Sequence, residues 1–146
     1  MYVDTAIFLK LLIPEPDSGH YARMIDGTEV YSSELARTEC FAALLRKERE
    51  RAVDGAGRRR AWKLFEGDID AGRICLLPIS AEVLASSRRI LEACHPHVAL
   101  RSLDALHLAS AEHLRSWPLC TNDLRMREAA KRLGMPLSAL RPTESL

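Results

Sequence analysis

Short apolar segments alternate with amphipathic helical patterns along most of the chain. The apolar segments predict strands at 1–3, 29–32, 74–79 and 119–121, with a further short strand near 136–139. The 3.6-residue patterns predict helices at 4–13, 18–25, 33–52, 58–70, 80–94, 102–114 and 124–133. Strands that alternate with helices form a parallel sheet wrapped by helices, so the pattern predicts an α/β sandwich.

Local signals place the helix ends and the buried helix faces. Prolines at 14 and 16 close the first helix, serines at 33, 80 and 102 are predicted N-caps, and 54–57 is a predicted turn. Gly72 and Gly134 are predicted to end their helices. Two apolar faces follow from the spacing, one on the helix at 58–70 and one on the helix at 80–94: Trp62, Phe65 and Ile69, and Val83, Leu84, Ser87, Ile90, Leu91 and Cys94.

Size and composition narrow the protein class. The chain has 146 residues, 47% of them hydrophobic, which predicts one domain over 1–140 and a short tail at 141–146. Its 21 basic and 20 acidic residues give a formal net charge of +1. That balance argues against a protein that coats nucleic acid through bulk charge, but it permits an enzyme with a local basic face.

The cysteines and the first residues of the chain bear on the cellular compartment of the protein. The four cysteines lack Cys-x-x-Cys spacing and three lie in apolar runs, which favours reduced, half-buried thiols. The first residues have no pattern of a signal peptide, and no apolar run approaches membrane-spanning length. We therefore expect a cytoplasmic protein that does not contact a membrane.

Four carboxylates lie where the sheet is expected to end. Asp4 and Asp123 follow predicted strands, Asp104 lies in the first turn of its helix, and Glu39 lies in the second turn of the helix after another strand. The carboxyl ends of parallel strands are where sites form, so these side chains are expected to converge there. Taken singly, each of the three aspartates is better explained as a helix cap than as a ligand.

Glu39 is too deep in its helix to act as a cap. Its neighbours at i−4, i+3 and i+4 are apolar or small, which predicts that the carboxylate faces inward. An inward charge needs a partner or a metal ion. Arg46, further along the same face, is the alternative explanation as a salt-bridge partner.

Four segments carry a family resemblance in chain order. They are Tyr2-Val3-Asp4-Thr5, the run ending in Ala36-Arg37-Thr38-Glu39, Leu103-Asp104-Ala105-Leu106-His107-Leu108-Ala109, and Leu119-Cys120-Thr121-Asn122-Asp123. Together they resemble the PIN-domain nucleases, in particular the VapC-type toxins of toxin–antitoxin pairs. The similarity covers nearly the whole chain and implies a three-layer α/β/α sandwich with a central parallel sheet.

The resemblance also implies a site and partners. It implies that the four acids hold a metal ion, that Thr5 and Thr121 assist them, and that the substrate is RNA cut to a 5′-phosphate and a 3′-hydroxyl. A cognate antitoxin and a homodimer are implied as well. Ala6 departs from the pattern, because many relatives carry serine there, which puts one supporting hydrogen bond in doubt.

An all-oxygen ligand set suits Mg²⁺, for which Mn²⁺ can substitute, rather than zinc. RNA phosphates need cations beside the metal, and we favour Arg101 and Arg125 because they flank proposed ligands. The triplet at 58–60 and Lys63 are equally well explained as a solvated helix face.

Two other functions fit parts of the sequence. Arg101 and His107, like Arg89 and His95, have the Arg-x₅-His spacing of the metal-independent HEPN ribonucleases, although those domains are all-helical. The non-enzyme alternative is a catalytically silent PIN-like domain that binds RNA or acts as a scaffold. The presence of all four carboxylates argues against it.

Overall fold

A computed structural model describes residues 1–140, so the predicted tail at 141–146 lies outside the described residues. Within that range the sheet has four parallel strands in the order β3-β2-β1-β4. The strands are β1 Tyr2–Val3, β2 Val30–Ser33, β3 Ile74–Leu77 and β4 Leu119–Cys120. The strands predicted at 1–3, 29–32, 74–79 and 119–121 and the parallel sheet are confirmed.

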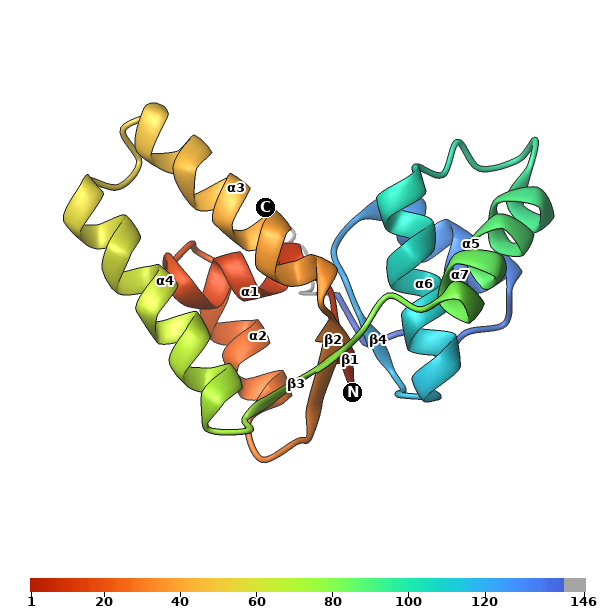
Figure 1. Ribbon diagram of the computed structural model, residues 1–146, viewed down its shortest axis with the longest axis horizontal. Coiled ribbons are helices and arrows are strands. Elements are labelled where there is room, and N and C mark those ends of the chain that lie inside the picture. The colour runs from red at the N-terminus through yellow and green to blue at the C-terminus, as the bar shows by residue number, and fades with distance from the viewer. Residues whose placement is uncertain (141–146) are drawn as a thin grey trace, which may run out of the picture.

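Helices cover both faces of this sheet (Figure 1). The helices are α1 Thr5–Leu12, α2 Ser18–Ile25, α3 Leu35–Arg49, α4 Gly55–Asp70, α5 Ala81–Cys94, α6 Ser102–Leu114 and α7 Leu124–Arg132. In Figure 1, α1 to α4 form one layer and α5 to α7 the other, with the sheet between them. The α/β/α sandwich is therefore confirmed.

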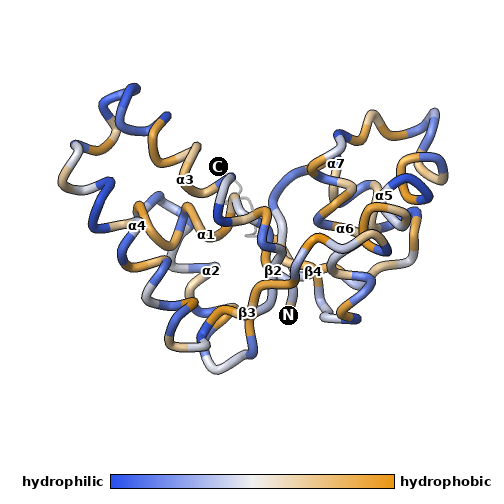
Figure 2. The backbone as a smooth tube through the Cα atoms, in the orientation of Figure 1, coloured by the Kyte–Doolittle hydropathy of each residue, from blue (hydrophilic) through white to orange (hydrophobic). Residues whose placement is uncertain are grey.

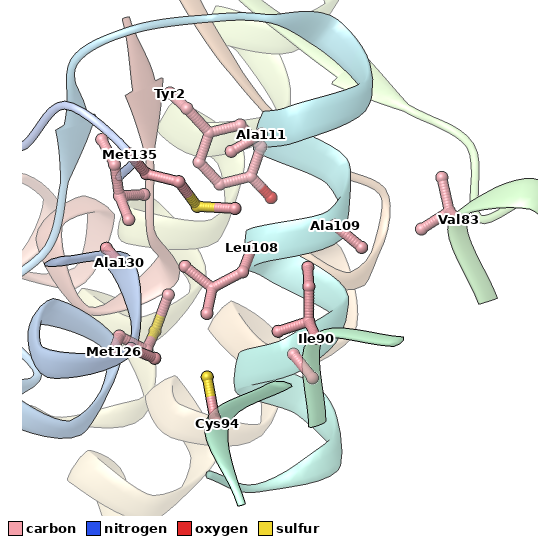
Figure 3. Close-up of a cluster of buried hydrophobic side chains, with 13 residues drawn as sticks. Tyr2, Val83, Ile90, Cys94, Leu108, Ala109, Ala111, Met126, Ala130 and Met135 are labelled. Carbon is pink, nitrogen blue, oxygen red and sulfur yellow. The ribbon is translucent and has the colours of Figure 1, made fainter. Parts of the chain in front are cut away.

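The two faces of β1 divide the core. Tyr2 packs into the cluster formed with α5, α6 and α7, while Val3 packs into the cluster formed with α1 to α4. Figure 3 shows Tyr2 beside Leu108 and Met135 in the first cluster. Both β1 side chains are fully buried, as alternation along a central strand requires. In Figure 2 the β3 segment is orange, the colour of hydrophobic residues.

Several local predictions were wrong by a residue or a turn. Asp54 belongs to no separate turn but caps α4, since its carboxylate accepts the Gly57 N–H at 2.7 Å. The cap of α6 is Arg101 rather than Ser102, because the Asp104 carboxylate accepts the Arg101 backbone N–H. The long helix α3 starts at Leu35, so Ser33 ends β2 and is not the N-cap residue, but its hydroxyl accepts the Leu35 N–H at 3.2 Å.

Two further predictions of helix ends are confirmed, and two predictions about Leu84 and the last strand are wrong. Ser80 caps α5, as predicted. Gly134 has φ of +70° and lies directly after the C-cap of α7, where a left-handed residue lets the chain turn away. Leu84 is exposed instead of buried with its stripe. The strand near 136–139 reduces to one parallel bridge between Leu119 and Leu137.

None of the helices within residues 1–140 combines the length and the apolar character needed to cross a bilayer.

Candidate active site

A cleft of about 540 Å³ opens at the carboxyl ends of the strands. All four predicted carboxylates line it, and they come from four distant segments of the chain. The sheet order explains this convergence, because β1 lies between β2 and β4 and the loops after these strands meet at one edge. The lining residues are Asp4, Thr5, Ala6, Leu9, Glu39, Ala42, Ala43, Arg46, Arg49, Arg101, Asp104, His107, Asn122, Asp123 and Met126.

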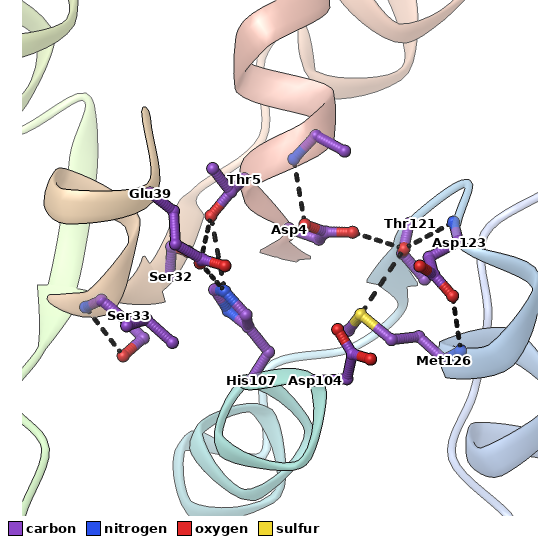
Figure 4. Close-up of polar contacts among 12 residues, drawn as sticks. Asp4, Thr5, Ser32, Ser33, Glu39, Asp104, His107, Thr121, Asp123 and Met126 are labelled. Carbon is purple, nitrogen blue, oxygen red and sulfur yellow. Dashed lines mark hydrogen bonds and ion pairs between the residues drawn. The ribbon is translucent and has the colours of Figure 1, made fainter. Parts of the chain in front are cut away.

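Asp4 uses its two oxygens for different tasks. Oδ1 accepts the Ala6 N–H at 3.0 Å and so caps α1, while Oδ2 accepts the Thr121 hydroxyl at 2.5 Å. Figure 4 shows both bonds. Because only 6% of Asp4 is exposed, burial raises the pKa of this carboxyl above its ordinary value. Asp4 therefore caps α1 and also lines the cleft.

Asp123 divides its oxygens in the same way. Oδ1 accepts the backbone N–H groups of Arg125 and Met126 and caps α7. Oδ2 lies 3.4 Å from the Arg101 guanidinium. Thr121 supports this arrangement as well, since its hydroxyl oxygen accepts the Asp123 N–H at 3.1 Å. Thr121 thus contacts two of the proposed acids at once.

Arg101 forms a bidentate ion pair with Asp104. Its Nε donates to Oδ2 at 2.9 Å and its second nitrogen donates to Oδ1 at 3.1 Å. Asp104 is buried, whereas the Arg101 side chain is 59% exposed. The arginine therefore bridges Asp104 and Asp123 from the solvent side.

Glu39 does not pair with Arg46, so that alternative was wrong. The Arg46 side chain points to Glu50, 3.9 Å away and one helical turn further on. Oε1 of Glu39 instead accepts two bonds, from the Thr5 hydroxyl at 2.9 Å and from His107 Nε2 at 2.5 Å. Ala42 and Ala43 line the cleft beside Glu39, so this side chain faces the cleft and is 25% exposed.

The Glu39–His107 pair shifts the pKa of both partners. Burial opposes the charge on Glu39, but the hydrogen bond and the positive charge of His107 outweigh it and lower the pKa of the carboxyl. Burial likewise opposes protonation of His107, but Glu39, Asp4 and Asp104 outweigh it and raise the pKa of the imidazole. Each partner thus favours the charged form of the other.

His107 is a site residue that our sequence analysis did not assign. It lies one turn after Asp104 on α6, so both side chains project from the same helix face. That i, i+3 spacing was a usable signal. A buried histidine on an apolar helix is nevertheless hard to place from sequence, because its partner, Glu39, lies 68 residues away.

The donor set fits a hard divalent cation, although the side chains do not form a ready-made cage. All four acids present carboxylate oxygens, the preferred ligands of Mg²⁺. Within 1–140, no three His, Cys, Asp or Glu side chains stand together in a metal-ligand cluster. At Asp104, the Arg101 guanidinium donates to both carboxylate oxygens.

Cations surround the mouth of the cleft. Arg46 and Arg49 line it from α3, and Arg101 lines it from the opposite wall. Arg125 is exposed on the first turn of α7 but does not line the cleft. The triplet at 58–60 lies on α4, also outside the lining, and Arg58 pairs with Glu48.

The profile of the PIN domain matches residues 1–132 of the sequence. The chain belongs to the PIN-domain family. Ribonuclease VapC46 of Mycobacterium tuberculosis is 36% identical over 142 residues, covering 95% of this chain and 96% of that relative. Ribonuclease VapC35 of the same species is 30% identical over 146 residues, with the same coverage. The resemblance to PIN-domain nucleases of the VapC type is confirmed.

Solved structures share the PIN fold of this chain. FitAcB from Neisseria gonorrhoeae aligns with a TM-score of 0.67 at 19% identity, over 93% of this chain and 94% of that one. VapBC2 from Rickettsia felis, bound to a DNA fragment from its promoter, aligns with a TM-score of 0.66 at 15% identity, over 94% and 96%. The all-helical HEPN alternative does not fit this α/β fold, and the Nε2 atom of His107 is already bound to Glu39.

Proposed function

We propose that this PIN domain, one domain over 1–140, is a Mg²⁺-dependent endoribonuclease, with Mn²⁺ able to replace Mg²⁺. The main observation in support is that four carboxylates line one cleft at the sheet edge. They are Asp4, Glu39, Asp104 and Asp123. The relatives support the reaction, because VapC46 and VapC35 are named ribonucleases. The products we propose are a 5′-phosphate and a 3′-hydroxyl.

The side chains divide the work. The four carboxylates would hold the metal, which when bound supplies Lewis-acid polarisation of the phosphate and a more acidic water. Thr121 orients Asp4, and Thr5 orients Glu39, through the hydrogen bonds described above. Release of Asp104 by Arg101 would expose both carboxylate oxygens to a cation and free the guanidinium for a phosphate oxygen.

RNA would lie across the mouth of the cleft. Arg46 and Arg49 on one wall and Arg101 on the other offer cations to successive phosphates. Arg125 would reach only RNA that extends beyond the cleft along α7. This local basic rim supplies phosphate binding in a chain whose net charge is only +1.

We also propose a toxin role in the cytoplasm, with an antitoxin partner and a homodimeric state. The support is similarity alone, to VapC relatives and to VapBC2, a neighbour bound to its promoter DNA. Expression of the chain should arrest bacterial growth, and co-expression of an antitoxin encoded beside it should relieve the arrest. Normal growth with abundant, active protein would instead indicate a housekeeping nuclease.

The nuclease proposal is tested by metal removal. EDTA should abolish cleavage of an RNA substrate, and Mg²⁺ or Mn²⁺ should restore it. Full activity in EDTA would refute metal dependence, and absence of cleavage with any metal would favour the RNA-binding alternative.

The acids are tested with matched controls. Asp4→Asn, Glu39→Gln, Asp104→Asn and Asp123→Asn should each lower the cleavage rate by orders of magnitude without unfolding the protein. The exposed Asp26→Asn and Glu128→Gln variants carry the same chemical changes outside the cleft and should keep wild-type rates.

A further inference from the structure

We propose that His107 is a positioning residue that fixes the Glu39 carboxylate for metal binding. The inference rests on the proposed function, because it takes Glu39 as a metal ligand. It goes beyond that function in assigning a role to a buried histidine that does not itself hold the metal. The observation behind it is a continuous hydrogen-bonded path from the centre of the sheet to Glu39.

The path begins at Tyr2 on β1. The Tyr2 hydroxyl lies 2.8 Å from His107 Nδ1, and His107 Nε2 lies 2.5 Å from Glu39 Oε1. Tyr2 is fully buried and His107 is 2% exposed, so neither ring can turn without disturbing the core. The two rings also pack edge to face, with their centroids 6.0 Å apart.

The chemistry of the imidazole fixes the direction of these bonds. Glu39 Oε1 only accepts, so His107 Nε2 must carry a hydrogen. In the neutral imidazole Nδ1 then accepts the Tyr2 hydroxyl proton, whereas in the charged form Nδ1 donates to the hydroxyl oxygen. Nε2 donates to Glu39 in both forms, so the positioning does not depend on the protonation state of His107.

The consequence for Glu39 is that its two oxygens become unequal. Oε1 is occupied by Thr5 and His107, while Oε2 makes no hydrogen bond within residues 1–140. A glutamate held by the Thr5 hydroxyl alone could exchange its two oxygens by rotation of its terminal torsion, which is a soft one. The second bond, from a rigid buried ring, removes that freedom and leaves Oε2 as the oxygen available to a cation.

His107 also ties the two walls of the cleft together. Glu39 belongs to α3, in one helical layer, and His107 belongs to α6, in the other layer (Figure 4). Asp104 projects from α6 one turn before His107. The bond from His107 to Glu39 therefore sets the separation between the carboxylates on α3 and α6.

The alternative is that His107 only satisfies polar groups in the core. The two roles predict different results for a variant that keeps a hydrogen-bond donor at the position of Nε2. Metal binding should be preserved in such a variant only if His107 positions Glu39. Glutamine places an amide N–H₂ near the position of the Nε2 atom, whereas asparagine places one near the position of Nδ1 and falls short of Glu39. Both residues are polar and close to each other in size, so they separate positioning from general core polarity.

The test compares His107→Gln with His107→Asn in Mn²⁺ binding, measured by titration calorimetry, and in RNA cleavage at saturating Mn²⁺. His107→Asn should lose about 10–100-fold in Mn²⁺ affinity, the range for partners that orient metal ligands, and should lower kcat with little change in KM. His107→Gln should stay close to wild type. Tyr2→Phe, which removes only the hydroxyl, should give a smaller loss of the same kind.

His113→Gln, on the exposed face of the same helix, is the control and should match wild type. Equal Mn²⁺ affinities for the wild type, His107→Gln and His107→Asn would overturn the positioning role. So would equal losses in the two variants, because a purely structural histidine predicts no rescue by glutamine. If wild type itself bound no Mn²⁺, the proposed function would fail instead, so the two failures are distinguishable.

Discussion

Replacing Asp4 with asparagine should stabilise the metal-free protein while inactivating it. Folding buries this carboxyl, and the loss of water around its charge is the main cause of its raised pKa, to which the nearby Glu39 charge adds. The substitution removes that charge with little other change. Asparagine Oδ1 can still accept the Ala6 N–H, and its N–H₂ can donate to the Thr121 hydroxyl oxygen.

Asparagine is also nearly as good a helix cap as aspartate, so α1 should keep its start. Changes that relieve an active site typically add up to about 2 kcal/mol to the free energy of unfolding. For a chain of this size, each 1 kcal/mol raises Tm by about 2–4 °C. In EDTA, Asp4→Asn should therefore melt at the wild-type temperature or several degrees above it.

Metal should reverse this order. A ligand at about 100 times its dissociation constant adds about 2.7 kcal/mol to the wild type, or roughly 5–10 °C in Tm. Asp4→Asn lacks one charged ligand and should gain less. The wild type should thus become the more stable protein in Mg²⁺.

The pH dependence follows from the sign of the pKa shift. The pKa of Asp4 is higher in the folded than in the unfolded protein, so the folded state binds the proton more tightly and wild-type stability falls as pH rises from the unfolded value, about 4, through the folded one. Asp4→Asn has no such group. The Tm advantage of the variant in EDTA should shrink as the pH is lowered toward about 4.

The assay is a thermal melt of both proteins, with EDTA and with Mg²⁺, at several pH values. The reasoning is refuted if Asp4→Asn melts clearly below the wild type in EDTA and Mg²⁺ leaves the wild-type Tm unchanged. Asp4 would then be a structural cap of α1 and no metal ligand.

Three further predictions concern the arginines and a helix cap. Arg101→Gln should raise Mn²⁺ affinity in calorimetric titration, because the guanidinium no longer covers Asp104, and should weaken RNA binding; unchanged Mn²⁺ affinity would contradict competition between arginine and metal. Arg46→Ala should reduce the slope of log K against log salt for single-stranded RNA by about 0.7, the value for one lost phosphate contact, and an unchanged slope would remove it from the RNA path. Asp54→Ala should lower the free energy of unfolding by about 1 kcal/mol in denaturant melts, since Asp54 caps α4, without changing the cleavage rate.

The pattern of the sequence already determined the layered fold and three positions at the site. Alternation of apolar segments with helical patterns depends on local spacing, and the parallel sheet follows from it. Asp4 and Asp123 directly follow strands, so their place at the carboxyl edge could be predicted before any contact was known. Glu39 could be placed because its helix follows the strand predicted at 29–32, whereas the place of Asp104 rested on the family resemblance.

The detailed partners were decided by the tertiary structure alone. Sequence spacing suggested Arg46 as the ion-pair partner of Glu39. Packing of α6 against the sheet instead places His107, 68 residues away, beside Glu39. Periodicity fixes which face of a helix is buried, but it carries no information on which distant side chain meets that face. A buried charge takes its partner from the elements packed against it, and their positions exist only once the chain has folded.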